Sequence, residues 1–199
     1  MSRGSAVSAA ILAGGRATRF GGRDKGALVV GGRSIVERQI GELSQVADDL
    51  LIVGGDPSVA LRYGVRYAPD RIAGCGPLGG VHAALSEAKH AVTLVLACDM
   101  PYVAAPLLHH LLSVMRDADL VVPRTERGYH PLCAAYARTC LEPITRRLTS
   151  GRLKLTDLFD DLRVTVVSAE TVAAFGDPGR LLANVNTPDQ YLSIEANKP

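Results

Sequence analysis

The chain has 199 residues, with 22 Lys and Arg against 20 Asp and Glu, a net charge of +2 and 47% hydrophobic residues. This length favours one domain over residues 1–199, and the composition is that of a globular protein rather than a disordered or acidic-tail protein. The near balance of charge disfavours nonspecific nucleic-acid binding and leaves only a local basic patch open.

Short apolar runs alternate with helical segments along the chain. Strands are predicted at residues 6–12, 50–53, 65–68, 92–97, 120–122, 132–136 and 164–167. Alternation of this kind is typical of a mostly parallel sheet that is covered by helices on both faces. The sequence therefore predicts an α/β fold.

Helix starts are marked by capping and proline signals. Ser34 with Glu37 forms a capping box before an amphipathic run to Leu43, and Thr139 with Glu142 repeats it before a helix that ends near Ser150. Further helices are predicted, from capping, proline and loop signals, at residues 81–88, 107–115 after a proline, and 187–196.

Ligands of an open α/β sheet bind beyond the carboxyl ends of its strands. The loops that follow strands are therefore the places to look for function. Residues 13–32, 69–80 and 98–104 form such loops.

The first loop combines glycines with cations. Residues 12–25 read LAGGRATRFGGRDK, in which glycines let backbone N–H groups approach phosphate oxygens and the cations neutralise charge. No glycine directly precedes Lys25 and no Ser or Thr follows it, so this is not a Walker A loop; Arg16 stands where a dinucleotide fingerprint needs glycine. A polyphosphate cradle is predicted here, with a glycine-rich surface loop as the alternative.

The third loop begins with a carboxylate. The predicted strand 92–97 ends in the sequence CDMP at residues 98–101, which places Asp99 at the same sheet edge as the glycine loop. A hard oxygen ligand at that point can hold Mg²⁺ between the protein and substrate phosphates. The alternative is a turn aspartate before Pro101.

The second loop carries Asp70 and then the glycines of GPLGG at residues 76–80. Asp70 can accept a nucleotide hydrogen bond or support the metal, and helix N–H groups near Gly79 and Gly80 can face a base or ribose. A turn aspartate at a helix entry explains this segment equally well if it is taken alone.

The cysteines and histidines show no metal-ligand spacing. Four cysteines without a CxxC pair indicate reduced thiols, and no stretch is long enough for a secretory core or a membrane helix, so a cytoplasmic protein is expected. Among the five histidines, His130 before Pro131 either lines a substrate site or belongs to a turn.

Taken together, the motifs at residues 12–26, 76–80, 98–101, 130–131 and 184–188 (NVNTP) resemble the molybdenum cofactor guanylyltransferases. This family is also called the molybdopterin-guanine dinucleotide biosynthesis protein A family. The resemblance covers nearly the whole chain. It implies a Rossmann-like three-layer nucleotidyltransferase fold, with a nucleotide half at about residues 1–104 and a pterin-substrate half at about 105–199.

The resemblance also implies a reaction and roles for residues. GMP would pass from GTP to the terminal phosphate of molybdopterin with release of pyrophosphate, in the presence of Mg²⁺. Molybdopterin-handling proteins and molybdoenzymes would be partners, without nucleic acid or membrane. The nucleotide would contact Leu12, Ala13, Gly14, Gly15 and Asp70, its phosphates would meet Arg19 and Lys25, Mg²⁺ would bind Asp99, and the pterin would face Asn184 and Asn186.

One departure and several alternatives stay open. Some family members carry Asn at the end of the second strand, where this chain has Gly54 and Gly55. The cradle reads phosphates and not bases, so a molybdopterin cytidylyltransferase or a sugar-phosphate nucleotidyltransferase remains an alternative. A non-enzymatic nucleotide-binding adaptor is a second alternative, which retention of Arg19, Lys25 and Asp99 disfavours.

Overall fold

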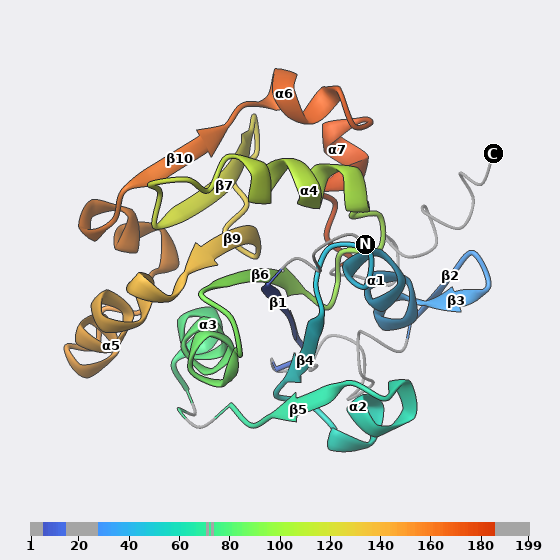
Figure 1. The fold of residues 1–199 in the computed structure, drawn as a ribbon, viewed down its shortest axis with the longest axis horizontal. Coiled ribbons are helices and arrows are strands. Elements are labelled where there is room, and N and C mark those ends of the chain that lie inside the picture. Colours follow the sequence, from blue (N-terminus) through green and yellow to red (C-terminus); the bar gives the residue numbers. More distant parts are fainter. Residues whose placement is uncertain (1–5, 15–27, 71, 73, 186–199) are drawn as a thin grey trace.

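A computed structural model describes residues 6–14, 28–70, 72 and 74–185. Within these residues an eight-stranded sheet has the order β10-β7-β9-β6-β1-β4-β5, with β8 beside β7 (Figure 1). The strands are β1 (Val7–Leu12), β4 (Asp49–Val53), β5 (Arg66–Ala68), β6 (Val92–Ala97), β7 (Leu120–Thr125), β8 (Gly128–Tyr129), β9 (Cys133–Ala137) and β10 (Val164–Val167).

The strand directions confirm the mostly parallel sheet. β6, β1, β4 and β5 run parallel to one another, β10 runs parallel to β7, and β9 is antiparallel to both β6 and β7. Each predicted strand is present: the bounds of β6 and β10 are exact, and those of the others differ by one to three residues. β2 (Val29–Val30) and β3 (Arg33–Ser34), which form a separate hairpin, were not predicted.

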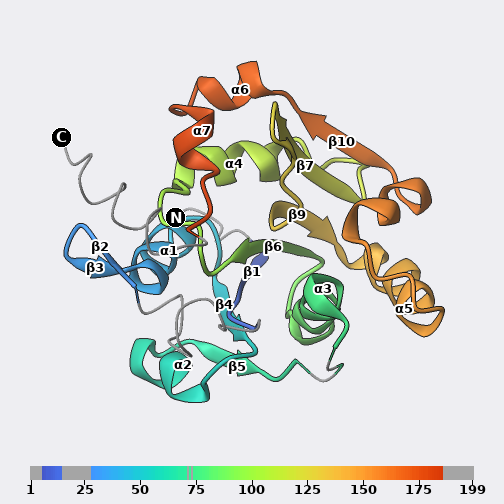
Figure 2. The ribbon, with the colours of Figure 1, turned by 180° about the vertical axis from the view of Figure 1, so that it is seen from behind.

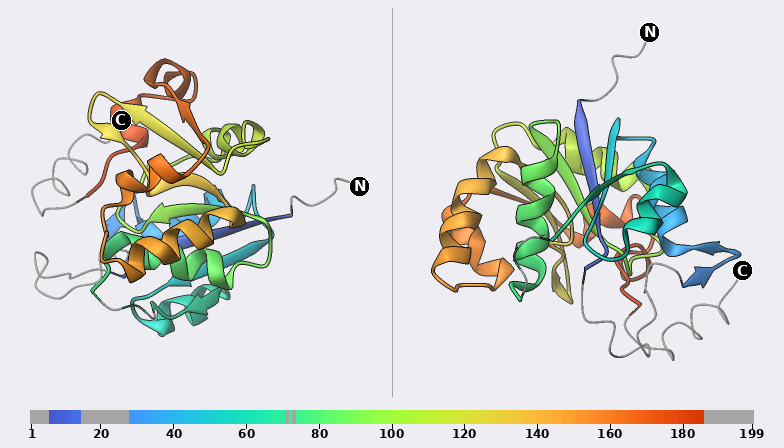
Figure 3. Two further views of the ribbon diagram at one scale, coloured as in Figure 1. Left: turned by 90° about the vertical axis from the view of Figure 1, so that its left-hand side faces the viewer. Right: turned by 90° about the horizontal axis from the view of Figure 1, so that it is seen from below.

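Helices cover both faces of the sheet, as the α/β pattern predicts. Along β1, Ala9 and Ile11 belong to the core that includes α1 (Ile35–Leu43) and α4 (Ala105–Ser113), whereas Ala10 and Leu12 belong to the core that includes α3 (Gly76–Glu87) and α5 (Leu141–Thr149). Alternate residues of a strand point to opposite faces, so a fully apolar strand feeds two cores. In the right-hand view of Figure 3, α3 and α1 lie on opposite sides of β1.

The predicted helix starts are right in one case and wrong in three. Ser34 caps α1 by accepting a hydrogen bond from the Glu37 N–H at 3.1 Å. The capping role of Thr139 is wrong, because its hydroxyl donates to Asp119 at 2.7 Å and a 3-10 turn (Arg138–Cys140) precedes α5. α3 begins at Gly76 rather than at residue 81, and α4 begins at Ala105, before its proline rather than after it.

Three short helices were not predicted. α2 (Pro57–Tyr63) follows β4, and α6 (Ala169–Ala173) and α7 (Pro178–Leu181) follow β10. α6 and α7 lie near α4 and β7, at the end of the molecule away from β5 (Figure 2). The predicted helix at residues 187–196 lies outside the described residues.

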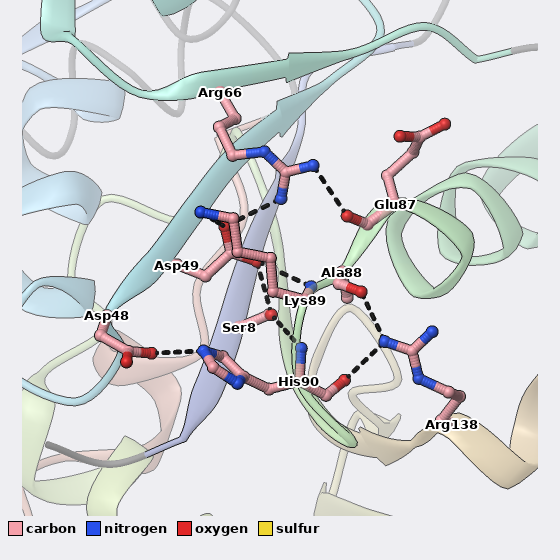
Figure 4. Close-up of polar contacts among 9 residues, drawn as sticks. All are labelled: Ser8, Asp48, Asp49, Arg66, Glu87, Ala88, Lys89, His90 and Arg138. Carbon is pink, nitrogen blue, oxygen red and sulfur yellow. Dashed lines mark hydrogen bonds and ion pairs between the residues drawn. The ribbon is translucent and has the colours of Figure 1, made fainter. Parts of the chain in front are cut away.

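A buried carboxylate ties the amino-terminal edge of the sheet together (Figure 4). Asp49 on β4 accepts hydrogen bonds from the Ser8 hydroxyl at 2.6 Å, the Arg66 guanidinium at 2.9 Å and the Lys89 backbone N–H at 3.0 Å. Burial alone would raise the pKa of Asp49, but these hydrogen bonds outweigh it and hold the pKa below 3.8. The network thus joins β1, β4, β5 and the segment before β6 with a charged group.

Across the described residues, no helix combines the length and apolar character that a membrane crossing requires.

Candidate active site

The carboxyl ends of four parallel strands are level with one another. Leu12 of β1 is paired with Val53 of β4 and with Ala97 of β6, and Val53 is paired with Ala68 of β5. Hydrogen bonds continue just beyond these ends: the Cys98 N–H donates to the Leu12 carbonyl at 3.2 Å. The predicted loops therefore begin side by side at one edge of the sheet.

Glycines allow the first loop to pack directly on the end of β4. Gly54 and Gly55 have φ angles of +71° and +67°. A Cβ at Gly54 would lie 3.1 Å from the Gly14 Cα, and one at Gly55 would lie 3.0 Å from the Ala13 Cβ. A Cβ at Gly54 would press on the Gly14 backbone, which would have to shift by a few tenths of an ångström, and side chains rarely adopt this positive φ, so the asparagine of some relatives would be strained here.

Asp70 lies between the first and second loops. A Cβ added at Gly14 would lie 3.8 Å from Asp70 Oδ2, and one added at Gly79 would lie 3.4 Å from Asp70 Oδ1. The Ile72 N–H donates weakly to the same Oδ1 at 3.4 Å. The structure therefore brings Asp70 to the start of the glycine loop.

The paired glycines of the second loop lie inside α3 rather than before it. A Cβ at Gly80 would be 3.2 Å from Leu12 Cδ1, and one at Gly79 would be 3.2 Å from the Ile72 carbonyl oxygen. Both positions thus allow the first turns of α3 to approach β1 and the Asp70 loop closely. Gly79 and Gly80 are the fourth and fifth residues of α3, where backbone N–H groups bond to carbonyls within the helix, so the predicted contact of these N–H groups with a base or ribose is not supported.

Asp99 follows β6 and contacts the late asparagine motif. Asp99 is 9% exposed. The Asn184 side-chain amide donates to Asp99 Oδ1 at 2.8 Å, and the Val185 N–H donates to the Asp99 carbonyl oxygen at 2.8 Å. Asn184, which the resemblance assigned to the pterin, therefore lies at the carboxylate assigned to the metal.

Two neighbouring side chains of α1 support the turn that carries Asp99. The Gln39 amide donates to the carbonyl oxygens of Ala97 at 2.7 Å and Met100 at 3.1 Å, and Arg38 Nε donates to that of Pro101 at 3.2 Å. Gln39 is 1% exposed. Sequence reasoning missed this role, although a glutamine on the apolar face of a helix is a signal for a buried polar contact.

Four predicted site residues lie outside the described residues: Gly15, Arg19, Lys25 and Asn186. Their roles stay predictions.

The donor set around Asp99 fits a hard divalent cation. Within the described residues there is no group of three or more His, Cys, Asp or Glu that could form a complete cage. One carboxylate at a partly open strand end is what Mg²⁺ needs when substrate oxygens and water complete its shell.

Comparison with known proteins gives the family. Residues 9–166 match the model of the MobA-like NTP transferase domain. The chain belongs to this family. It is 39% identical over 182 residues to a probable molybdenum cofactor guanylyltransferase of Pelotomaculum thermopropionicum, covering 92% of this chain and 88% of the relative. It is 34% identical to the molybdenum cofactor guanylyltransferase of Desulfosudis oleivorans, covering 96% of this chain and 95% of that protein.

Solved structures agree with this assignment. The molybdopterin-guanine dinucleotide biosynthesis protein A of Archaeoglobus fulgidus superposes with a TM-score of 0.81 at 26% identity, over 95% of this chain and 97% of that one. A 4-diphosphocytidyl-2C-methyl-D-erythritol synthase of Anaerococcus prevotii has a TM-score of 0.73 at 16% identity and covers 97% and 96%, so it shares the fold alone. The resemblance to molybdenum cofactor guanylyltransferases and the nucleotidyltransferase fold are confirmed, and this chain is a nucleotidyltransferase.

Proposed function

We propose that this protein transfers GMP from GTP to the terminal phosphate of molybdopterin and releases pyrophosphate. The observation that carries the proposal is the register of β1 and β6, in which Leu12 pairs with Ala97. The glycine loop and Asp99 therefore begin at adjacent strand ends. The identity of 39% to a probable molybdenum cofactor guanylyltransferase supports the choice of substrates.

The donor nucleotide occupies the side of the site between β1 and α3. Backbone of Leu12, Ala13, Gly14 and Gly15 binds the guanine nucleotide, and Asp70 accepts a hydrogen bond from it. This assignment is supported by the close approach of Gly14 and Gly79 to the Asp70 carboxylate. Arg19 and Lys25 neutralise the phosphates, including the charge that develops on the leaving pyrophosphate.

Mg²⁺ is held by Asp99, with Asn184 beside it, and when bound it neutralises charge on the phosphate oxygens. Asp99 needs a fixed direction for this task. The hydrogen bond from Asn184 and the carbonyl contacts of Gln39 give it one. Asn184 and Asn186 are also proposed to face the acceptor, since they follow directly on the segment that reaches Asp99.

The chemistry requires little of the protein beyond position and charge. A phosphate oxygen of molybdopterin forms a bond to the α-phosphorus of GTP while the bond from that phosphorus to the pyrophosphate oxygen breaks. A phosphate is already a nucleophile at neutral pH, so no catalytic Ser, Cys or His is needed. Preorganised donors contribute a few kcal/mol each to such a step.

The proposal also covers the domain, the compartment and the partner proteins of the reaction. Residues 1–199 act as one catalytic domain in the cytoplasm, with the nucleotide half at about 1–104 and the pterin half at about 105–199. Molybdopterin-handling proteins supply the acceptor and molybdoenzymes take the product.

The test is turnover of each ribonucleoside triphosphate with molybdopterin and Mg²⁺, followed by pyrophosphate release and detection of the dinucleotide. Preference for GTP supports the proposal. Preference for CTP would replace it with a cytidylyltransferase, and release at background level with authentic substrates would favour a non-enzymatic adaptor.

A further inference from the structure

The β2–β3 hairpin connects the segment after the glycine loop to the start of α1. Leu28 is the first residue described after that loop, and its carbonyl accepts a hydrogen bond from the Ile35 N–H at 2.9 Å. The hairpin lies beside α1 (Figure 1). A two-stranded hairpin is marginally stable by itself, so its place depends on the side chains that pack against it.

Those side chains form a small core of their own. It consists of the buried Val30, Ile35 and Val185, with the half-buried Leu28 and Tyr102 packed against them. The small core therefore joins three parts of the chain: the hairpin with the start of α1, the turn that follows β6, and the late asparagine motif. Close-packed side chains transmit displacements, so the position of Val30 constrains that of Val185.

Val185 also holds the main chain of Asp99. Its N–H donates to the Asp99 carbonyl oxygen at 2.8 Å, and the residue before it, Asn184, donates to Asp99 Oδ1 at 2.8 Å. Two consecutive residues thus fix both the main chain and the carboxylate of Asp99. The side chain of Val185 in the small core sets where this pair of residues lies.

A polar contact joins the hairpin to the same turn. Arg38 on α1 is half-buried, and its Nη1 donates weakly to the Val30 carbonyl oxygen at 3.5 Å while its Nε donates to the Pro101 carbonyl oxygen at 3.2 Å. The guanidinium is planar and rigid, so its two contacts keep a fixed distance from each other. Val30 is therefore coupled to the Asp99 turn through Arg38 as well as through Val185.

We propose that the β2–β3 hairpin is a positioning element for Asp99. Val30 is the positioning residue, and it acts through Val185 and Asn184 without touching a substrate. The hairpin follows the glycine loop directly in the chain, so the small core holds the predicted phosphate cradle and the predicted metal ligand to one geometry. The consequence for Mg²⁺ rests on the proposed function, whereas the consequence for the Asp99 contacts does not.

The first experiment compares Val30→Ala with Val46→Ala by amide hydrogen exchange in the metal-free protein. Both valines are buried and lose the same two methyl groups, but Val46 follows the other end of α1 and is not part of the small core. The Val185 N–H reports on the contact with Asp99. The Ala137 N–H, whose hydrogen bond to the Asp119 carbonyl is also 2.8 Å long, is the reference.

Val30→Ala is expected to speed exchange at Val185, relative to Ala137, by about tenfold or more, because the contact opens locally. Val46→Ala should leave this ratio within about twofold, since a loss of global stability affects both amides alike. Arg38→Met, which removes the polar contact without emptying the small core, should act in the same direction as Val30→Ala. An unchanged ratio in both Val30→Ala and Arg38→Met would overturn the positioning role.

The second experiment measures the Mg²⁺ concentration that gives half-maximal turnover. Val30→Ala is expected to raise it and Val46→Ala to leave it unchanged. In the Asn184→Ala background, Val30→Ala should produce little further increase, because two residues that act through one contact are not additive. Full additivity would overturn positioning through Asn184. Absence of dinucleotide formation by the wild type would overturn the proposed function instead, and the exchange ratio would still decide the positioning role.

Discussion

Asn184 donates a 2.8 Å hydrogen bond to Oδ1 of Asp99, a residue that precedes it by 85 positions. The contact joins the late asparagine motif to the turn after β6. It gives the carboxylate a fixed direction at the sheet edge where the glycine loop begins. The two motifs are therefore in direct contact.

Asp99→Asn is expected to abolish turnover, because the substituted amide has no charge with which to hold Mg²⁺. Asn184→Ala is expected to lower activity less, by raising the Mg²⁺ concentration needed for half-maximal rate. Initial rates across a Mg²⁺ titration measure both effects. Near-normal rates in Asp99→Asn would contradict the metal role.

Gln39→Leu is expected to disturb the Asp99 turn, since the carbonyls of Ala97 and Met100 lose their donor. Buried carbonyls without partners cost about 1–3 kcal/mol of unfolding free energy. The half-activating Mg²⁺ concentration should rise as well, which a purely structural role would not produce. Gln45→Leu is the matched control, because Gln45 is exposed and its side-chain amide donates only to the Gly41 carbonyl among the contacts described. Unchanged Mg²⁺ dependence in Gln39→Leu would refute a positioning role.

Gly54→Asn is expected to weaken GTP binding and to lower the free energy of unfolding by about 1–3 kcal/mol. The new Cβ would press on Gly14, at the start of the glycine loop. Gly64→Asn provides the control, because Gly64 has a similar φ of +65° and a Cβ there would meet nothing within 4 Å. Denaturant unfolding and nucleotide titration measure the difference. Equal effects of the two substitutions would show that backbone conformation, and not the contact with Gly14, decides the outcome.

Asp49→Asn is expected to lower the free energy of unfolding at pH 7 by about 1–3 kcal/mol, through loss of charged hydrogen bonds in the network of Figure 4. Because the folded pKa of Asp49 is depressed, its contribution is present above the ordinary value of 3.8 and is lost as the pH falls through the folded pKa. Below pH 3.8 the free energy of unfolding of the variant should therefore fall less steeply with pH than that of the wild type.

Asp48→Asn serves as its control, because the Asp48 side chain is 52% exposed and contacts His90 at 2.8 Å on the surface. Its effect should remain within about 1 kcal/mol. If the free energy of unfolding fell with the same slope at acid pH in the wild type and in Asp49→Asn, the stabilising role of the charged Asp49 would be contradicted.

Cys75 is expected to be the first cysteine to react with a thiol reagent. Burial raises the pKa of the Cys133 and Cys140 thiols to about 12, with Asp119 adding to the effect at Cys140, whereas Cys75 is partly exposed. A Cβ at Gly79 would lie 3.2 Å from the Cys75 Cβ and 3.4 Å from Asp70 Oδ1, so Cys75 borders the proposed nucleotide site. GTP should slow its alkylation, as followed by mass spectrometry. Equal rates with and without GTP would place the nucleotide elsewhere.

Much of the fold could be predicted from the sequence, because buried parallel strands consist of short runs of apolar residues. β1 and β6 are apolar along most of their length and were found with nearly correct bounds. The missed helices are short: α7 has four residues and contributes one buried side chain, Leu181, so periodicity carries no signal there.

The site could be predicted in part. Asp70 and Asp99 follow strand ends, and topology brings strand ends to one edge. The partner of Asp99 could not be found in this way, because the hydrogen bond from Asn184 depends on how α7 and the chain after it pack. Gln39 was missed for a related reason. Its partners are backbone carbonyls, which every residue has, so residue types do not reveal them.

The dependence of Asp99 on Asn184 and Val185 also affects how the enzyme is made. During synthesis the Rossmann-like half emerges from the ribosome well before residue 184. A nascent chain that has already paired β1 with β6 still has Asp99 without these two contacts. Assembly of the carboxylate's surroundings is therefore a late event in biogenesis, and it follows the pairing of β1 with β6.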